Sequence, residues 1–95
     1  MANRRDLKKE INLLHYEVIT DCIAYLDVNQ KQDDSKVETI INKMMDARER
    51  IFAEINKPTS KMSKKDVRTR YYQIINEVKE STDGLYEILS TLPRD

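Results

Sequence analysis

The side chains with the widest chemical repertoire in this chain of 95 residues are one histidine and one cysteine. His15 and Cys22 lie seven residues apart on the same face of a predicted helix, which separates them by roughly 10 Å along its axis. That distance is too long for both to bind one metal ion within a single helix. The sequence contains no His-x-x-x-His, Cys-x-x-Cys or Glu-x-x-His motif, so we predict no metal or other cofactor. We interpret His15 as a histidine at the edge of a core with a local hydrogen bond, and Cys22 as a small buried thiol.

Arg48 also invites a chemical interpretation, because it falls within a stripe of Ile, Met and Phe residues at helical spacing. A guanidinium is rarely buried without a partner, since removing its charge from water is costly. Counting antiparallel from the chain reversals places Arg48 within about a turn of Asp21 and Glu77. We predict that it pairs with one of these carboxylates or extends outward between helices. A contact that sets helix register is the favoured function, and an anion or carboxylate site inside the fold is the alternative.

Catalysis has little support in this sequence. With one glycine in the whole chain, no Gly-rich loop is available to cradle phosphate groups. Serine and threonine occur mainly near expected helix caps and connections, and the lone histidine has no nucleophile at a suitable spacing. We therefore predict a protein that is not an enzyme and has no small-molecule substrate.

The composition excludes several classes of protein. Hydrophobic residues make up 39% of the chain and charged residues 36%, which is too apolar for a disordered chain and too polar for a membrane span. A single cysteine cannot form an intrachain disulfide, and no apolar run follows the basic start as in a secretory signal. We expect a cytoplasmic protein that does not interact with membranes.

Apolar residues recur at helical spacing in three segments, which predicts helices at about 4–29, 36–57 and 64–92. The predicted N-caps are Asn3, Ser35 and Ser63, and Ser35 is expected to form a capping box with Glu38. Connections of about six residues make neighbouring helices antiparallel. The predicted fold is therefore all-α, an antiparallel up-down-up three-helix bundle that forms one domain over residues 1–95.

Gly84 interrupts the third apolar stripe without changing its phase. A glycine inside a helix costs about 1 kcal/mol relative to alanine. We favour one continuous helix, and the alternative is a break near Asp83 followed by a short fourth helix.

Basic residues should gather at one end of this bundle although the formal net charge is zero. The start of the first helix meets the second connection and the start of the third helix, together with two helix N-termini that attract anions. The candidate contacts for a nucleic acid or another polyanion are Arg4, Arg5, Lys8, Lys9, Lys61, Lys64, Lys65 and Arg68. The favoured interpretation of this end is a solvated surface that maintains solubility.

Three apolar residues of the first helix lie away from its main stripe. Leu13, Tyr16 and Ile23 fall on the edge or back of this helix and, with Thr20, form a second, narrow strip. Scattered exposed apolar residues are common. The alternative is a homodimer formed through the first helix.

The beginning of the chain resembles a known set of proteins. The sequence Met1-Ala2-Asn3-Arg4-Arg5-Asp6-Leu7-Lys8-Lys9-Glu10-Ile11-Asn12, followed by an apolar stretch with one cysteine, is similar to the start of a family of small uncharacterised bacterial all-helical proteins. The similarity covers the first dozen residues and, beyond them, only length and helical character. It implies a cytoplasmic bacterial protein and carries no activity or site residue with it.

These observations favour a non-enzymatic helical interaction module that binds another protein, or a second copy of itself, through its helix surfaces. The alternative is nucleic-acid or polyanion binding through the basic end. A remote third hypothesis, an enzyme or small-ligand carrier around Arg48 and His15, requires a core pocket of several hundred Å³.

Overall fold

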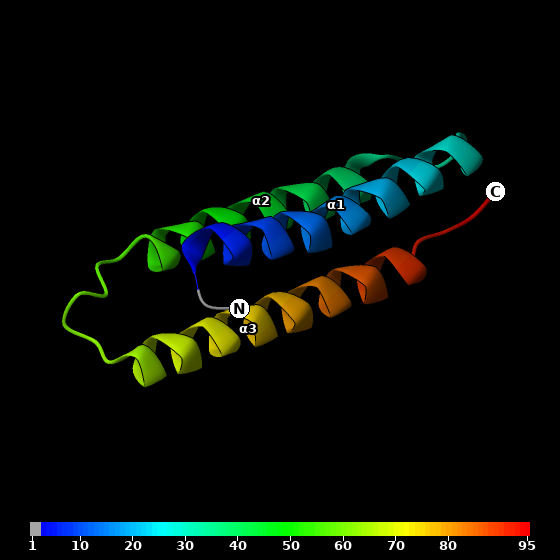
Figure 1. Cartoon of the computed structure of the whole chain (residues 1–95). Coiled ribbons are helices and arrows are strands. Elements are labelled where there is room, and N and C mark those ends of the chain that lie inside the picture. Colours follow the sequence, from blue (N-terminus) through cyan, green and yellow to red (C-terminus); the bar gives the residue numbers. More distant parts are fainter. Residues whose placement is uncertain (1–2) are drawn as a thin grey trace.

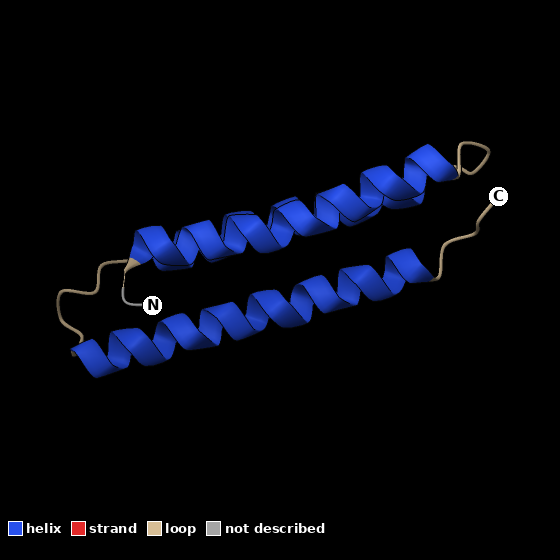
Figure 2. Cartoon of the chain, turned by 45° about the vertical axis from the view of Figure 1, so that its right-hand side comes forward, coloured by secondary structure: helices blue, strands red, loops and turns tan. Residues whose placement is uncertain are grey.

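The computed structural model describes residues 3–95, and within them the chain forms three helices and no strand. These are α1 (Arg4–Val28), α2 (Ser35–Ile55) and α3 (Lys64–Ser90). Helix α2 runs antiparallel to α1 and α3, and each helix contacts the other two (Figure 1). The bundle measures 54 × 18 × 17 Å, and α3 follows the α1–α2 pair along its whole length (Figure 2). The predicted up-down-up three-helix bundle is confirmed. Met1 and Ala2, which open the basic start, lie outside the described residues.

Two of the three predicted caps form as expected. At the start of α1, the Asn3 side chain accepts a hydrogen bond from the backbone N–H of Asp6 at 2.8 Å. At the start of α3, the Ser63 hydroxyl accepts one from the N–H of Asp66 at 3.1 Å. Each cap satisfies an N–H group that has no partner inside its helix, and each acidic residue lies near the positive end of the helix dipole.

The predicted capping box at the start of α2 is wrong. Ser35 is the first residue inside the helix, and Asp34 occupies the cap position without a side-chain cap hydrogen bond. The carboxylate of Asp33 accepts the N–H of Ser35 at 2.9 Å instead. Two acidic residues directly before the serine thus compete with its hydroxyl for the free N–H groups, and one of them takes this role.

The helices end one or two residues earlier than predicted. Helix α2 ends at Ile55, ahead of the proline at position 58, and α3 ends at Ser90. Leu92 lies beyond the end of α3 and still packs into the core, with 7% of its surface exposed. Helix α3 continues through Gly84, so the alternative of a short fourth helix is excluded.

The core consists of two clusters along the bundle axis, and each draws on all three helices. One lies toward the α1–α2 connection and includes Cys22, Met44 and Leu85, and the other lies toward the opposite end and includes Ile11 and Ile55. Full burial of such side chains contributes about 1.5–3 kcal/mol each. The predicted stripes therefore hold the bundle together.

The Met44–Met45 pair divides between the core and the surface. The two methionines are adjacent in the sequence, but 49% of the Met45 surface is exposed and only 1% of the Met44 surface. Consecutive residues point about 100° apart around a helix, so the narrow buried face of α2 accommodates one of the two.

The residues after α3 bind the connection between α1 and α2. The backbone N–H of Asp95 donates to the buried Asn29 side chain at 2.8 Å, while the Asn29 amide donates to the carbonyl of Tyr25 at 2.9 Å. The Tyr25 hydroxyl donates to the carbonyl of Pro93. These bonds satisfy the polar groups of a buried chain reversal, and helical periodicity does not predict them.

Gly84→Ala should stabilise the protein. A Cβ atom at this position meets no atom within 4 Å, and the residue has ordinary helical backbone angles. The gain should be about 0.5–1 kcal/mol in the free energy of unfolding, because alanine loses less backbone entropy than glycine. Urea unfolding checks this, with Ala53→Gly on the exposed face of α2 as the matched control that should lose a similar amount. An unchanged or lower midpoint for Gly84→Ala would contradict the prediction.

Candidate functional site

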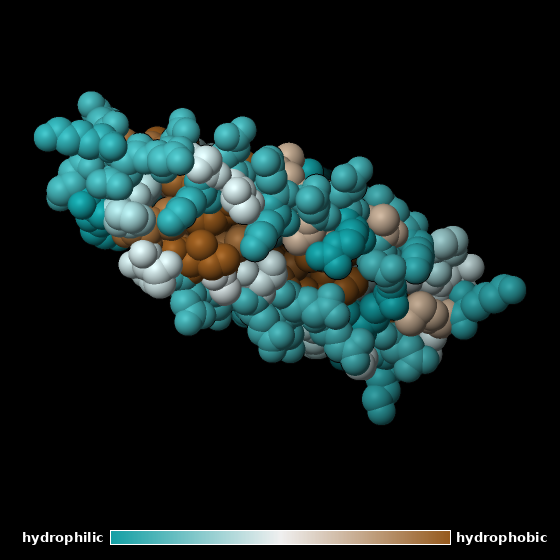
Figure 3. All heavy atoms as spheres, turned by 180° about the vertical axis from the view of Figure 1, so that it is seen from behind, coloured by the Kyte–Doolittle hydropathy of each residue, from teal (hydrophilic) through white to brown (hydrophobic). Residues whose placement is uncertain are grey.

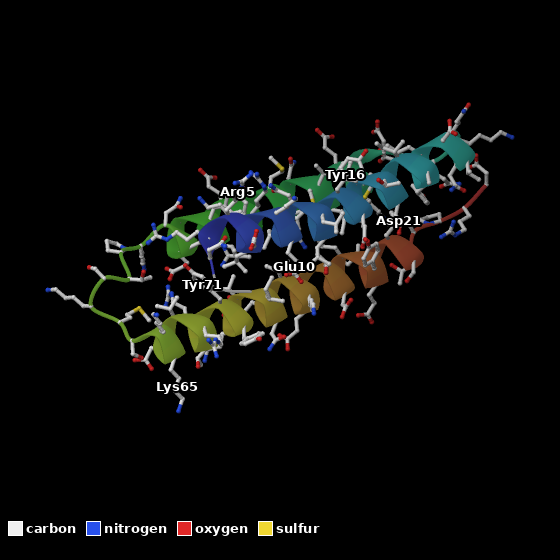
Figure 4. The ribbon with its side chains drawn as sticks, in the orientation of Figure 1. Arg5, Glu10, Tyr16, Asp21, Lys65 and Tyr71 are labelled. Carbon is white, nitrogen blue, oxygen red and sulfur yellow. The ribbon has the colours of Figure 1, made fainter. Side chains whose placement is uncertain are left out.

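One face of α1 carries large apolar side chains that nothing in the bundle covers. The exposed fractions are 60% for Leu13, 67% for Tyr16 and 60% for Ile23. They lie opposite the buried residues Leu7 and Cys22, and Figure 4 shows Tyr16 pointing away from α3. We call the set Leu13, Tyr16, Thr20 and Ile23 the α1 strip.

Two further features describe the surface of the α1 strip. The Thr20 hydroxyl donates to the backbone carbonyl of Tyr16 at 2.9 Å, so this hydroxyl keeps a partner when water is removed. A shallow hollow of about 520 Å³ lies beside Leu13 and Tyr16 and is formed by residues of α1 alone. The other exposed large hydrophobic residues in the described part of the chain are Val28, Met45, Met62, Tyr72 and Ile88, which are spread over all three helices and a connection. The α1 strip is therefore a concentrated apolar surface.

The basic end lies, as expected, where the start of α1 meets the connection between α2 and α3. Two of its cations have structural roles. A guanidinium nitrogen of Arg4 donates to the carbonyl of Lys57 at 2.7 Å, and the ammonium of Lys8 donates to the Asn56 side chain at 2.6 Å. Both acceptors directly follow the end of α2, where the helix dipole is negative. Arg4 and Lys8 thus fasten the start of α1 to the end of α2.

Glu54 neutralises two further cations near this end. Its carboxylate pairs with Lys57 at 2.7 Å and with Arg70, and the hydrogen bonds from these two side chains lower its pKa. Among residues 3–95, the cations at this end that are exposed and form no ion pair are Arg5, Lys9, Lys61, Lys64, Lys65 and Arg68. Lys65 extends away from the bundle in Figure 4. Six of the eight predicted contact residues therefore present charge to solvent.

Arg48 does not pair with Asp21 or Glu77, so the first of its two predicted outcomes is wrong. The side chain is half-buried and extends outward between α1 and α2, which is the second outcome. Two of its nitrogens donate to the side-chain oxygen of Asn12, at 3.1 and 3.0 Å. Its guanidinium carbon lies 4.3 Å from the centre of the Phe52 ring, a favourable cation–π distance. Asn12 and Phe52 satisfy the guanidinium without a carboxylate, which makes Arg48 a structural contact between α1 and α2.

The two carboxylates proposed for Arg48 lie on other sides of the bundle. Asp21 lies on the side of α1 that faces α3 (Figure 4). Burial raises the pKa of Tyr86 in α3, and the nearby Asp21 carboxylate raises it further. Glu77 borders a groove between α2 and α3. A helical wheel places Arg48 near the centre of its stripe, but the handedness of the bundle decides which margin of α2 faces α1.

His15 is buried, with 3% of its surface exposed, and its Nδ1 atom has no hydrogen-bond partner. The predicted local hydrogen bond is therefore absent at this atom. Burial lowers the pKa of His15, and the positive charge of Arg48 lowers it further, so the imidazole is neutral at pH 7. Cys22 is fully buried as predicted, and burial, followed by the charge of Asp21, raises the pKa of its thiol. A buried, protonated thiol is a poor nucleophile.

The grooves of the bundle lie on its surface. A groove of about 500 Å³ runs between α2 and α3, with Ile51 and Ile74 in its lining and the Glu54–Arg70 pair at its border. Hydrophobic atoms are also visible along the middle of the back face, between borders of hydrophilic atoms (Figure 3). Neither His15 nor Arg48 lines this groove, and the hollow beside Arg48 is formed by α2 and by Asn56, the residue that follows it. Neither this groove nor this hollow is the core pocket that the small-ligand hypothesis requires.

Residues 3–95 contain neither a cluster of candidate metal ligands nor a membrane-spanning helix. No group of three or more His, Cys, Asp or Glu side chains in this range is placed to hold a metal ion. None of the three described helices combines the length and apolar character needed to cross a bilayer. Comparisons with protein families, with curated proteins and with solved structures find no match.

The two partners of Arg48 escaped prediction for different reasons. Arg48 and Phe52 are four residues apart, a spacing at which helical side chains meet, so their contact had a detectable signal. The same holds for Glu54 and Lys57, three residues apart. Asn12 lies on another helix, and its contact with Arg48 depends on how α1 and α2 pack.

The stability of the protein should fall as the pH drops from about 7 to 5, and His15→Leu should remove part of that fall. In the unfolded chain the histidine takes up a proton near its ordinary pKa of 6.5, whereas the folded chain resists protonation because its pKa is lower. The contribution is therefore fully present above 6.5 and is lost as the pH falls through the lowered pKa. Urea midpoints at several pH values measure the slope, and equal slopes for the two proteins would contradict this origin.

Proposed function

We propose that this protein is a non-enzymatic helical interaction module that binds a protein partner through the α1 strip. The observation that carries the proposal is the alignment of Leu13, Tyr16 and Ile23 on one helix face, each at least 60% exposed. All three lie on the face of α1 opposite the core.

These exposed side chains keep apolar surface in contact with water, which is unfavourable. Burying apolar surface gains roughly 25 cal/mol per Å², so a partner that covers the strip recovers a gain that folding leaves unused. Large apolar side chains spaced three and seven residues apart share one face of α1, and aligned side chains of this kind are used by helices to bind grooves or other helices. Tyr16 adds an aromatic ring, a residue type that is enriched in protein interfaces. The strip is thus better suited to a protein than to a charged or small ligand.

A second candidate function is the binding of a polyanion at the basic end. The observation in its favour is the group of six exposed cations without ion pairs near the N-termini of α1 and α3. Lys64 and Arg68 also border a surface hollow of about 520 Å³. Charge of this kind attracts phosphate backbones with a strong dependence on salt concentration.

Tyr16→Lys should abolish capture of a protein partner, whereas Tyr72→Lys should not. Both tyrosines lie on helix surfaces and are exposed to a similar degree, 67% and 57%, but Tyr72 is on α3, outside the α1 strip. The tagged protein and both variants are incubated with nuclease-treated extract of the native cell, and bound proteins are quantified by mass spectrometry. A lysine in the strip must lose its solvent when a partner binds, which is costly.

Circular dichroism first establishes that both variants keep the helical content of the original protein. Capture of the same proteins by all three chains would contradict a role for the α1 strip. Loss of capture with Tyr72→Lys alone would move the interface to α3.

The basic end is tested by replacing Lys61, Lys64 and Lys65 with glutamate. If this end binds polyanions, affinity for heparin and for single- and double-stranded DNA should be lost in the triple variant. In the original protein the affinity should fall steeply as salt is added. Absence of DNA and heparin binding by the original protein at low salt would exclude this function. Protein capture through the α1 strip should be unaffected by the triple substitution.

A further inference from the structure

Lys9 and Asp27 continue the α1 strip at its two ends. The six residues that then share this face are Lys9, Leu13, Tyr16, Thr20, Ile23 and Asp27. Their spacing alternates between four and three residues, as along the seam of a coiled coil. At about 100° per residue they fall within an arc of about 80°. All six are exposed, so α1 presents a complete seam with no helix packed against it.

The residues of this seam are complementary to the same seam on a helix that runs in the opposite direction. Lys9 and Asp27 each lie nine residues from Val18, on opposite sides of it. Leu13 and Ile23 are each five residues from the same centre. Reversing the seam therefore brings a cation level with an anion and one aliphatic side chain level with another.

The geometry points to a second copy of this chain as the occupant of the seam, with the two α1 helices antiparallel about a two-fold axis level with Val18. This inference rests on the proposed function, because it names the partner of the same surface. In this arrangement Lys9 faces Asp27 of the second copy, and Leu13 faces Ile23 of the second copy. At the centre, the large Tyr16 side chain lies opposite the smaller Thr20 of the second copy, next to the axis.

The charges decide between the two directions of pairing. In a parallel dimer each Lys9 would face the other Lys9, and the two Asp27 carboxylates would also meet, which disfavours that arrangement at both ends. In the antiparallel dimer Lys9 of one copy faces Asp27 of the other, and the two-fold symmetry repeats this attractive pair at the other end of the interface. Glu17 is the carboxylate nearest the axis. Its exposed position at the margin of the seam limits the repulsion between the Glu17 side chains of the two copies.

The dimensions of the seam predict a weak dimer. Eighteen residues separate Lys9 from Asp27, so the seam is about 27 Å long and one helix wide. This length is half of the 54 Å length of the bundle. An interface of this length that is one helix wide buries an area at the small end of the range for specific interfaces. We expect a dissociation constant that is roughly micromolar or weaker. The dimer is therefore sought over a wide range of protein concentrations.

The register is tested by exchanging the charges in the full chain. Sedimentation equilibrium compares the original protein with Lys9→Asp, Asp27→Lys and the double variant, at low salt. Each single substitution turns two attractive pairs into two repulsive ones and should weaken the dimer about tenfold. The double variant restores both pairs with their signs reversed and should recover the original affinity. Tyr16→Lys should give a monomer, and Tyr72→Lys should dimerise like the original protein.

The direction of the helices is measured with spin labels attached to Ala24→Cys, because Ala24 is exposed and the fully buried Cys22 is protected from labelling. Position 24 lies six residues from the axis, so two labels in the antiparallel dimer are offset by about 18 Å along the helices. In a parallel dimer they would lie side by side. Electron resonance distance measurements separate these cases.

Three results would overturn the antiparallel dimer. One is a protein that stays monomeric at all concentrations, another is a dimer unchanged by both single charge substitutions, and the third is a label distance of a parallel pair. The proposed function has a separate readout. If the protein is monomeric while Tyr16→Lys still abolishes capture of a different protein, the α1 strip binds that protein and the self-association is wrong. If Tyr16→Lys changes neither dimerisation nor capture, both proposals fail.

Discussion

The rest of this structure depends on the burial of one narrow stripe per helix. A bundle of 18 × 17 Å in cross-section leaves room for a single layer of side chains between three helices. That layer takes up the stripes of α1, α2 and α3 in two clusters. Because the interior is filled in this way, the accessible chemistry of the protein lies on its outer faces, and function must be sought on surfaces.

The distribution of charge follows from the same packing. Antiparallel helices bring the start of α1 to the end of α2, where Arg4 and Lys8 bind groups just past the helix end. Nearby, Glu54 holds Lys57 and Arg70. A cluster of basic residues in the sequence thus divides in the fold. Some of its members hold the adjacent helix ends together, and the remainder are exposed to solvent.

Not every polar group near the core has a hydrogen-bond partner of the expected kind. The Arg48 guanidinium is bound by an amide and an aromatic ring instead of a carboxylate, while the neighbouring His15 leaves one ring nitrogen without a partner. The two are coupled, since the charge of Arg48 helps to keep the imidazole neutral. An unpaired polar atom in the interior lowers stability. Burial of the imidazole, which lowers its pKa, makes stability depend on pH.

The sequence by itself determined the helices, two of their three caps, the antiparallel order and the residues that lie away from the core, such as Tyr16. These follow from local periodicity and from short connections, which act along the chain. Only the tertiary structure decided that Arg48 binds Asn12, that Asp21 faces α3, and that Asn29 holds the C-terminal residues. The reason is that periodicity gives the angle of a side chain around its own helix, whereas its partner depends on the handedness and axial offset with which neighbouring helices pack.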